Sequence, residues 1–309
     1  MKIRSGRVWI NMIPKVIHYC WFGGKPIPDE YKKYMASWKQ LCPDFEIIEW
    51  NEKNFDVSEN EYCHEAYKSK KWAFVSDYAR LKILYEQGGV YLDTDVELLK
   101  PLFPMISKGI GFLGFQNEEE VNTGLGFAAP PHNSCVKEMM NLYRERHFLK
   151  EKGKFDLSPC PVANTVALKQ CGLKTGRKFC REIQYLDGLD VYPITYFNPI
   201  NPDNMRLVIS QETVSIHHYA ASWTGKKRRM LRNVKKYFGG GHCTTGLCIY
   251  QGAIFGNSKK IIPDILGYCF YVLLYISDNW FTTFCYIKGR FLCRQFGCNK
   301  YQLSGGAEL

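Results

Sequence analysis

The sequence predicts an α/β fold in which helices flank a central sheet within one body, residues 13–224. Short runs rich in β-branched and aromatic residues alternate with longer segments of helical periodicity, and this alternation is typical of α/β sheets rather than sandwiches or bundles. The composition, with 46% hydrophobic and 23% charged residues, is that of a folded chain. A length of 309 residues suffices for one large domain with appendages.

The elements follow from local patterns. We expect strands at residues 16–22, 45–50, 90–92, 111–115, 125–128 and 214–219, and helices at residues 28–41, 70–86, 134–149 and 160–170. The clearest helix, residues 70–86, carries one apolar stripe formed by Phe74, Tyr78, Leu81 and Tyr85. Gly88 and Gly89 then supply the left-handed stop that commonly ends a helix.

The two ends of the chain differ in composition from the body. Residues 1–12 precede the first strand, and we interpret them as an extension that the fold does not need. Of the net charge of +11, residues 225–309 contribute 13 basic against 3 acidic residues, which leaves the body nearly neutral. This segment is also aromatic, but its longest uninterrupted apolar stretch, Ile265 to Ser277, is too short to span a bilayer. Docking on an anionic membrane surface is the functional interpretation, and a solvated basic face is the alternative.

The 13 cysteines form no compact framework, and the first 11 residues lack the apolar core of a signal peptide. We therefore expect a cytoplasmic protein whose thiols are reduced. We also expect it to be a peripheral protein at the inner face of the cell membrane. A loose spacing of cysteines in the C-terminal segment leaves a zinc site open as an alternative. Nucleic-acid binding is not expected, because no recognisable nucleic-acid-binding motif accompanies the basic residues.

Two carboxylates form the centre of the expected site. Asp93 and Asp95 follow the apolar run Val90–Leu92, which places them at the carboxyl end of a buried strand, where open α/β sheets bind ligands. Residues two apart in an extended chain face the same side, so both carboxylates can hold one cation. Mn²⁺ or Mg²⁺ accepts such oxygen ligands together with substrate phosphates. A solvated acidic turn is the alternative interpretation.

Asp77 and Arg80 add to this pattern because they share one face of the preceding helix. Together they offer the paired acceptors and donors that sugar hydroxyls require, although an ordinary surface ion pair has the same spacing. Asn122-Thr123-Gly124, between two expected strands, is either a simple turn or the place where an acceptor approaches.

Three segments of the chain, taken in their sequence order, resemble the glycosyltransferases bearing the DXD sugar-binding motif. These segments are Ile13 to Gly24, Ser76 to Arg80 and Gly88 to Asp95. That group includes fungal Golgi mannosyltransferases, bacterial capsule and polysaccharide enzymes and, more distantly, glucosylating bacterial toxins. The resemblance implies a GT-A fold, with a Rossmann-like sheet that binds a nucleotide sugar. It also implies metal-dependent, retaining transfer to a saccharide. A lipid-linked saccharide acceptor is expected where the C-terminal segment docks on a membrane.

The resemblance also implies residue roles. Trp21 is expected near the nucleotide base, Asp77 and Arg80 at donor-sugar hydroxyls, and Tyr91 in support of the donor. Asp93 and Asp95 are expected to bind the metal, with Asp93 also contacting ribose or sugar. A C-terminal element is expected to close over the diphosphate; its members are His218, Ser222 and Trp223. Asp93, Asp95 and Trp223 are the residues expected to carry catalysis.

Two rival functions remain open at the level of sequence. Phosphatases of the haloacid-dehalogenase type also place Asp-x-Asp after an apolar strand, but near the N-terminus and without the preceding Asp77-x-x-Arg80. A catalytically inactive carbohydrate-binding or scaffold protein at the membrane would retain the fold without turnover. A dinucleotide-binding motif and a P-loop are both excluded, because the segment Gly23-Gly24-Lys25-Pro26 lacks the glycine spacing that they require.

Overall fold

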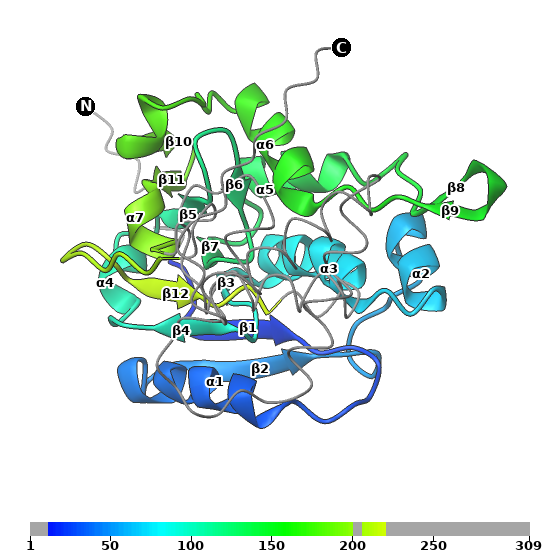
Figure 1. Ribbon diagram of the computed structural model, residues 1–309, viewed down its shortest axis with the longest axis horizontal. Coiled ribbons are helices and arrows are strands. Elements are labelled where there is room, and N and C mark those ends of the chain that lie inside the picture. The colour runs from blue at the N-terminus through cyan, green and yellow to red at the C-terminus, as the bar shows by residue number, and fades with distance from the viewer. Residues whose placement is uncertain (1–11, 200–205, 221–309) are drawn as a thin grey trace, which may run out of the picture. The chain divides into compact units, whose positions relative to one another are not determined.

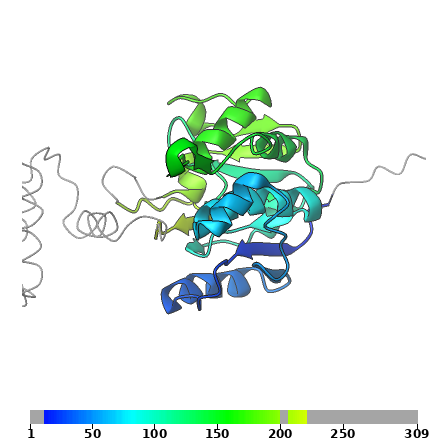
Figure 2. The same cartoon turned by 90° about the vertical axis from the view of Figure 1, so that its right-hand side faces the viewer.

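The computed structural model describes residues 12–199 and 206–220. The chain divides into two compact units, residues 1–239 and 240–309, and all described residues lie in the first. Figures 1 and 2 show the described part as a central sheet with helices on both faces. The α/β class with a flanked central sheet is therefore confirmed. The expected extension at residues 1–12 (apart from Met12), the C-terminal segment 225–309, Ser222 and Trp223 lie outside the described residues.

The central sheet is mixed, in the order β10-β11-β5-β7-β3-β1-β2, with β6 paired to β5. β1 is parallel to β2 and β3, and β11 is parallel to β5, whereas β7 runs antiparallel between β3 and β5. The strands are β1 (Val16–Cys20), β2 (Glu46–Trp50), β3 (Gly89–Tyr91), β5 (Gly111–Phe115), β6 (Val121–Asn122), β7 (Phe127–Ala129), β10 (Gln184–Leu186) and β11 (Leu189–Tyr192).

Two further pairs of strands lie outside this sheet. β4 (Val96–Leu98) pairs antiparallel with β12 (Ser215–His217), and β8 (Leu149–Lys150) forms a hairpin with β9 (Lys154–Phe155). The α-helices are α1 (Asp29–Leu41), α2 (Glu61–Lys68), α3 (Trp72–Gln87), α4 (Phe103–Ile106), α5 (Ser134–Asn141), α6 (Cys160–Gln170) and α7 (Ile194–Phe197). Among the described helices, none combines the length and apolar character that a membrane crossing requires.

The sheet separates two apolar cores. Helices α2, α3, α5 and α6 pack on one face, and α1, α4 and α7 pack on the other. Strand side chains alternate between them: in β3 and the residue after it, Val90 and Leu92 join the α1 core and Tyr91 joins the α3 core. Helix α3 is buried around most of its circumference, so the apolar stripe read from the sequence is only part of its packing surface.

A polar contact within the sheet fixes where β3 begins. The His18 ring of β1 donates from Nε2 to the Gly88 carbonyl oxygen at 3.0 Å and accepts at Nδ1 from Trp50 Nε1 at 3.0 Å. Gly88 and Gly89 have φ of +64° and +104°, and a Cβ on Gly89 would lie 2.9 Å from His18 Nε2. Both the backbone conformation and the close approach therefore require glycine here. The expected stop after residues 70–86 is confirmed.

One expected helix is too long. The pattern of residues 134–149 predicts a single helix, but α5 ends at Asn141. Beyond it, Arg146 bonds to Asp156 and His147 bonds to Glu65, and Leu149 enters the β8–β9 hairpin. These tertiary contacts outweigh the local helical preference, which is weak for a segment so short.

Candidate functional site

The Asp93-Thr94-Asp95 segment forms the turn between β3 and β4. Strand pairing continues one residue past β3, where Leu92 N donates to the His18 carbonyl oxygen, and a turn follows in which Val96 N donates to the Asp93 carbonyl oxygen at 3.0 Å. The two aspartates therefore converge through a turn, and not through the two-residue period of an extended strand. The expected position beyond the end of a buried strand is nevertheless what the structure shows.

The antiparallel pairing of β12 with β4 brings a histidine to this turn. His217 is opposite Val96 in the register, and its Nε2 lies 3.1 Å from Asp95 Oδ1 and 3.9 Å from Asp93 Oδ2. Asp95 Oδ2 also accepts from Ala220 N at 2.7 Å. The ligand atoms that Asp93, Asp95 and His217 offer lie within 4.8 Å of one another, which is close enough to surround one ion.

The neighbouring histidine faces elsewhere. His218 Nε2 lies 2.9 Å from Glu97 Oε2, and its ring stacks on Tyr34 with centroids 3.9 Å apart. The sequence analysis assigned donor binding to His218, whereas the structure brings His217 to the aspartates. The donor-binding role of His218 stays a prediction.

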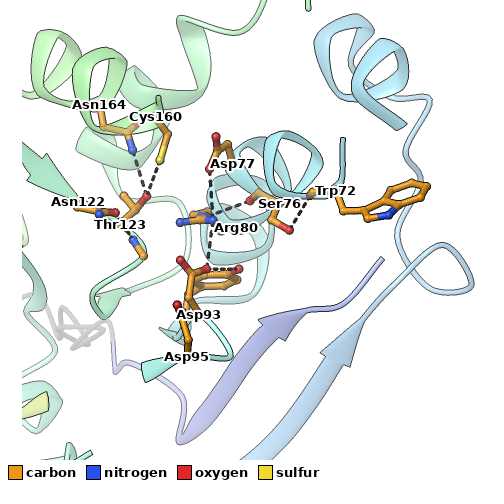
Figure 3. Close-up of polar contacts among 12 residues, drawn as sticks. Trp72, Ser76, Asp77, Arg80, Asp93, Asp95, Asn122, Thr123, Cys160 and Asn164 are labelled. Carbon is orange, nitrogen blue, oxygen red and sulfur yellow. Dashed lines mark hydrogen bonds and ion pairs between the residues drawn. The ribbon is translucent and has the colours of Figure 1, made fainter. Parts of the chain in front are cut away.

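Arg80 links the helix to the turn. Its Nη2 lies 3.3 Å from Asp77 Oδ1 and 3.2 Å from Asp93 Oδ1, and its Nε donates to the Ser76 carbonyl oxygen (Figure 3). Tyr91 donates from its hydroxyl to the same Asp93 oxygen at 3.1 Å. Four of the residues predicted for the site, Asp77, Arg80, Tyr91 and Asp93, therefore form one connected network.

The charges of this network do not balance. Burial raises the pKa of Asp77 and of Asp93, although Arg80 beside them acts in the opposite direction. Burial also opposes ionisation of Asp95, but the adjacent His217 and the Ala220 amide lower its pKa to about 2. Asp77 and Asp95 are buried and Asp93 is partly buried. When these three carboxylates are ionised they face one guanidinium, so the site carries excess negative charge even with His217 protonated. Two carboxylates and an imidazole with this excess charge fit a divalent cation.

The network opens into a pocket of about 840 Å³. Aromatic side chains line one part of it, and polar ones line another; they include Trp21, Tyr31, Trp72, Ser76, Asn122 and Cys160. Trp21 donates from Nε1 to the Lys25 carbonyl oxygen and meets Tyr31 edge to face at 6.0 Å. Trp21 thus lines the same pocket as Asp77, Arg80, Asp93 and Asp95. Tyr91 contacts Asp93 through its hydroxyl and Arg80 through its ring.

Sequence reasoning missed a glycine that shapes the site. A Cβ on Gly124 would lie 2.2 Å from Asp93 Oδ2 and 3.1 Å from Arg80 Nη1. Thr123 beside it is fully buried and accepts at Oγ1 from Asn164 Nδ2 at 3.1 Å. The turn Asn122-Thr123-Gly124, which the sequence offered as a candidate acceptor position, therefore does two things. It places Asn122 in the lining of the pocket, and its Gly124 leaves space for the Asp93 carboxylate.

Comparison with known proteins agrees with this geometry. Residues 28–111, which include α3 and the Asp93-Thr94-Asp95 turn, match the family described as glycosyltransferase sugar-binding region containing DXD motif. The family that these residues match is the one that the motifs predicted. The flanked α/β sheet is in keeping with the GT-A fold expected for that family.

Two curated relatives show how far the similarity extends. Inositol phosphoceramide mannosyltransferase 1 of Schizosaccharomyces pombe is 28% identical over 154 residues, covering 46% of this chain and 47% of the relative. A glycosyltransferase of Acanthamoeba polyphaga mimivirus is 33% identical over 111 residues, covering 34% of this chain and 44% of the relative. The chain thus spans less than half the length of these relatives.

Among solved structures, the PaToxG glycosyltransferase aligns with a TM-score of 0.39 and 18% identity. The alignment covers 51% of this chain and 69% of that one.

Proposed function

We propose that this protein transfers a sugar from a nucleoside-diphosphate sugar, with UDP or GDP as the nucleotide, to a saccharide or lipid-linked saccharide acceptor. One observation carries the proposal: Asp93, Asp95 and His217 converge beside the Asp77–Arg80 pair in a single pocket. The first set suits a cation that neutralises a diphosphate, and the second suits the hydroxyls of a sugar. The mechanism of the alternative, a haloacid-dehalogenase-type phosphatase, does not require the Asp77–Arg80 pair.

Each group of residues in the pocket has its own proposed role in sugar transfer. A divalent cation at Asp93, Asp95 and His217 would supply the positive charge that stabilises a departing diphosphate. Arg80 orients the Asp93 carboxylate and, with Asp77, presents one donor group and one acceptor group to the sugar. Trp21 and Tyr31 offer ring faces and edges for a nucleotide base. Trp223 and Ser222, expected to close over the diphosphate, remain part of the proposal.

We favour Mn²⁺ over Mg²⁺ at this site. Mg²⁺ prefers oxygen ligands alone, whereas an imidazole nitrogen among the ligands suits a first-row transition metal better. A ligating histidine must be neutral, so the cation would displace the proton that His217 shares with Asp95.

The proposed transfer retains the anomeric configuration, which requires either a covalent intermediate on a carboxylate or attack by the acceptor on the face that the diphosphate leaves. Among the described residues that line the pocket, the carboxylates are Asp77, Asp93 and Asp95. Arg80 holds the first two, and His217 and the Ala220 amide hold the third. Attack by the acceptor on the same face as the departing diphosphate is therefore the proposed route. Synthesis of capsular or other cell-surface polysaccharide, at the inner face of the membrane, is the proposed setting.

Donor hydrolysis tests the proposal directly. A panel of UDP- and GDP-sugars is incubated with the protein and Mn²⁺, and the released nucleotide is measured by mass spectrometry. We expect hydrolysis of one donor, its loss with a chelator, and at least a hundredfold loss in Asp95→Asn. Asp29→Asn, at an exposed carboxylate of α1, is the matched control and should leave the rate unchanged. Turnover of a phosphomonoester without any donor hydrolysis would favour the phosphatase, and donor binding without turnover would favour the scaffold.

A further inference from the structure

The β8–β9 hairpin takes no part in the site, and it projects from the described body (Figure 1). Every residue from 149 to 155 is exposed, including two large apolar side chains, Leu149 at 40% and Phe155 at 39%. Leu157, just beyond the hairpin, is 54% exposed. Single exposed apolar residues are ordinary, but several gathered on one projecting hairpin, whose tip is formed by residues 151–153, indicate an interaction surface.

The same tip is basic. Within residues 149–155, three lysines stand against the single acid Glu151. The link between α2 and α3 adds more positive charge, since Lys71 Nζ lies 5.3 Å from the centroid of the Phe155 ring. The basic side chains of this surface are Lys68, Lys70, Lys71, Lys150, Lys152 and Lys154.

The hairpin is anchored in the body by its base. Phe148 is fully buried and stacks on Phe155, with ring centroids 5.2 Å apart. Leu149 N donates to Glu65 Oε2 at 2.8 Å, and Asp156 N donates to the Phe148 carbonyl oxygen at 2.7 Å. The tip is thus presented in a fixed conformation, so docking it costs little ordering entropy.

This surface adjoins the mouth of the pocket. Lys70 and Lys71 line the pocket from the α3 side, and Pro159 and Cys160 line it just after the hairpin in the chain. A surface that contacted the hairpin would therefore lie beside the pocket proposed to bind donor and acceptor.

We propose that the β8–β9 hairpin, together with Lys70 and Lys71, docks this chain on a membrane surface rich in anionic lipids. Leu149 and Phe155 enter the headgroup layer, and the lysines contact lipid phosphates. The basic side chains of this surface are all lysine, which is depleted from protein interfaces, where arginine is enriched. This composition favours a lipid surface over an acidic protein. The proposal goes beyond sugar transfer, because docking requires neither donor nor metal.

The experiment measures binding of the full chain to phosphatidylcholine vesicles with and without phosphatidylserine, by sedimentation. The test variant combines Leu149→Ser with Lys152→Glu, because Leu149 anchors the hairpin through its backbone N and not through its side chain. Its control combines Tyr185→Ser with Lys178→Glu, which also replace one exposed large apolar residue by serine and one lysine by glutamate, near β10 at the edge of the central sheet. We expect binding to the anionic vesicles only, at least tenfold weaker in the test variant and within twofold of wild type in the control.

A local readout separates the hairpin from the basic segment 225–309, which can also attract anionic lipid. Hydrogen–deuterium exchange of the amides in residues 149–155 is measured with and without vesicles. Slower exchange there on anionic vesicles supports the proposal. Vesicle binding with unchanged exchange at the hairpin would overturn it, and so would failure to sediment with either vesicle, the result expected for a protein partner. Neither measurement uses a nucleotide sugar, so failure here leaves donor hydrolysis as a separate question.

Discussion

Replacing Gly124 by alanine should disable the metal site while leaving the backbone unstrained. Gly124 does not have the left-handed φ that favours glycine, so alanine is compatible with its conformation. The added Cβ, however, would lie 2.2 Å from Asp93 Oδ2. A carbon and an oxygen in contact need about 3.3 Å, so the carboxylate oxygen must retreat by about 1 Å.

Asp93 cannot make that movement freely. Its other oxygen lies 3.2 Å from Arg80 Nη2 and accepts from the Tyr91 hydroxyl at 3.1 Å. Metal–ligand distances tolerate deviations of about 0.2 Å, several times less than the displacement required. Disturbing the groups that orient a ligand commonly costs tenfold to hundredfold in metal affinity, and we expect a loss in that range.

Isothermal titration with Mn²⁺ checks this expectation. Gly153→Ala is the control, because Gly153 has φ of +68° and no atom within 4 Å of its added Cβ. That variant suffers backbone strain without a clash and should bind Mn²⁺ as the wild type does. If Gly124→Ala also binds Mn²⁺ with unchanged affinity, the assignment of Asp93 as a ligand is refuted.

Three further predictions address the histidines and the half-buried Arg146. His217→Ala should lower Mn²⁺ affinity at least tenfold, whereas His218→Ala should change it less than twofold, as measured by titration. Burial lowers the pKa of His18 to about 4, below its unfolded value, so its stabilising contribution is full above pH 6.5 and is lost as the pH falls toward 4. Urea unfolding should show a loss of about 3 kcal/mol over that range; a His18→Gln variant, which keeps a donor and an acceptor for Gly88 and Trp50, should lose less. Arg146→Met should cost about 2 kcal/mol in the same assay, because it removes the guanidinium from the buried Asp156 carboxylate; an unchanged midpoint would contradict this.

Local patterns were enough to predict the elements that build the site. The helical period of residues 70–86, followed by two glycines and an apolar run, predicted α3, the stop after it and β3 in the right order. The acid and base on α3 and the aspartates after β3 were therefore found from spacing alone. Each of these signals spans fewer than 20 residues, so no distant contact is needed to read it.

The rest depends on contacts between distant parts of the chain. His217 reaches Asp95 only because β12 pairs with β4, more than 110 residues earlier in the sequence. Gly124 matters because the Asp93 carboxylate approaches its backbone, an event that no local pattern records. The hairpin after α5 was missed for the same reason, since Glu65 and Asp156 recruit residues that would otherwise continue a helix.

The role of Arg80 follows from the balance of charges in the pocket. Without a guanidinium, Asp77, Asp93 and Asp95 would place three negative charges in a buried site, and mutual repulsion would favour protonation of one or more. With Arg80 shared between Asp77 and Asp93, the remaining excess negative charge is close to that neutralised by one divalent cation. A diphosphate brings further negative charge of its own, so the proposed donor can enter only if cation and diphosphate bind together. The arrangement therefore ties metal binding to donor binding. Arg80→Met should weaken Mn²⁺ binding, measured by titration with Mn²⁺, and also donor binding, measured by titration with the nucleotide sugar in the presence of Mn²⁺.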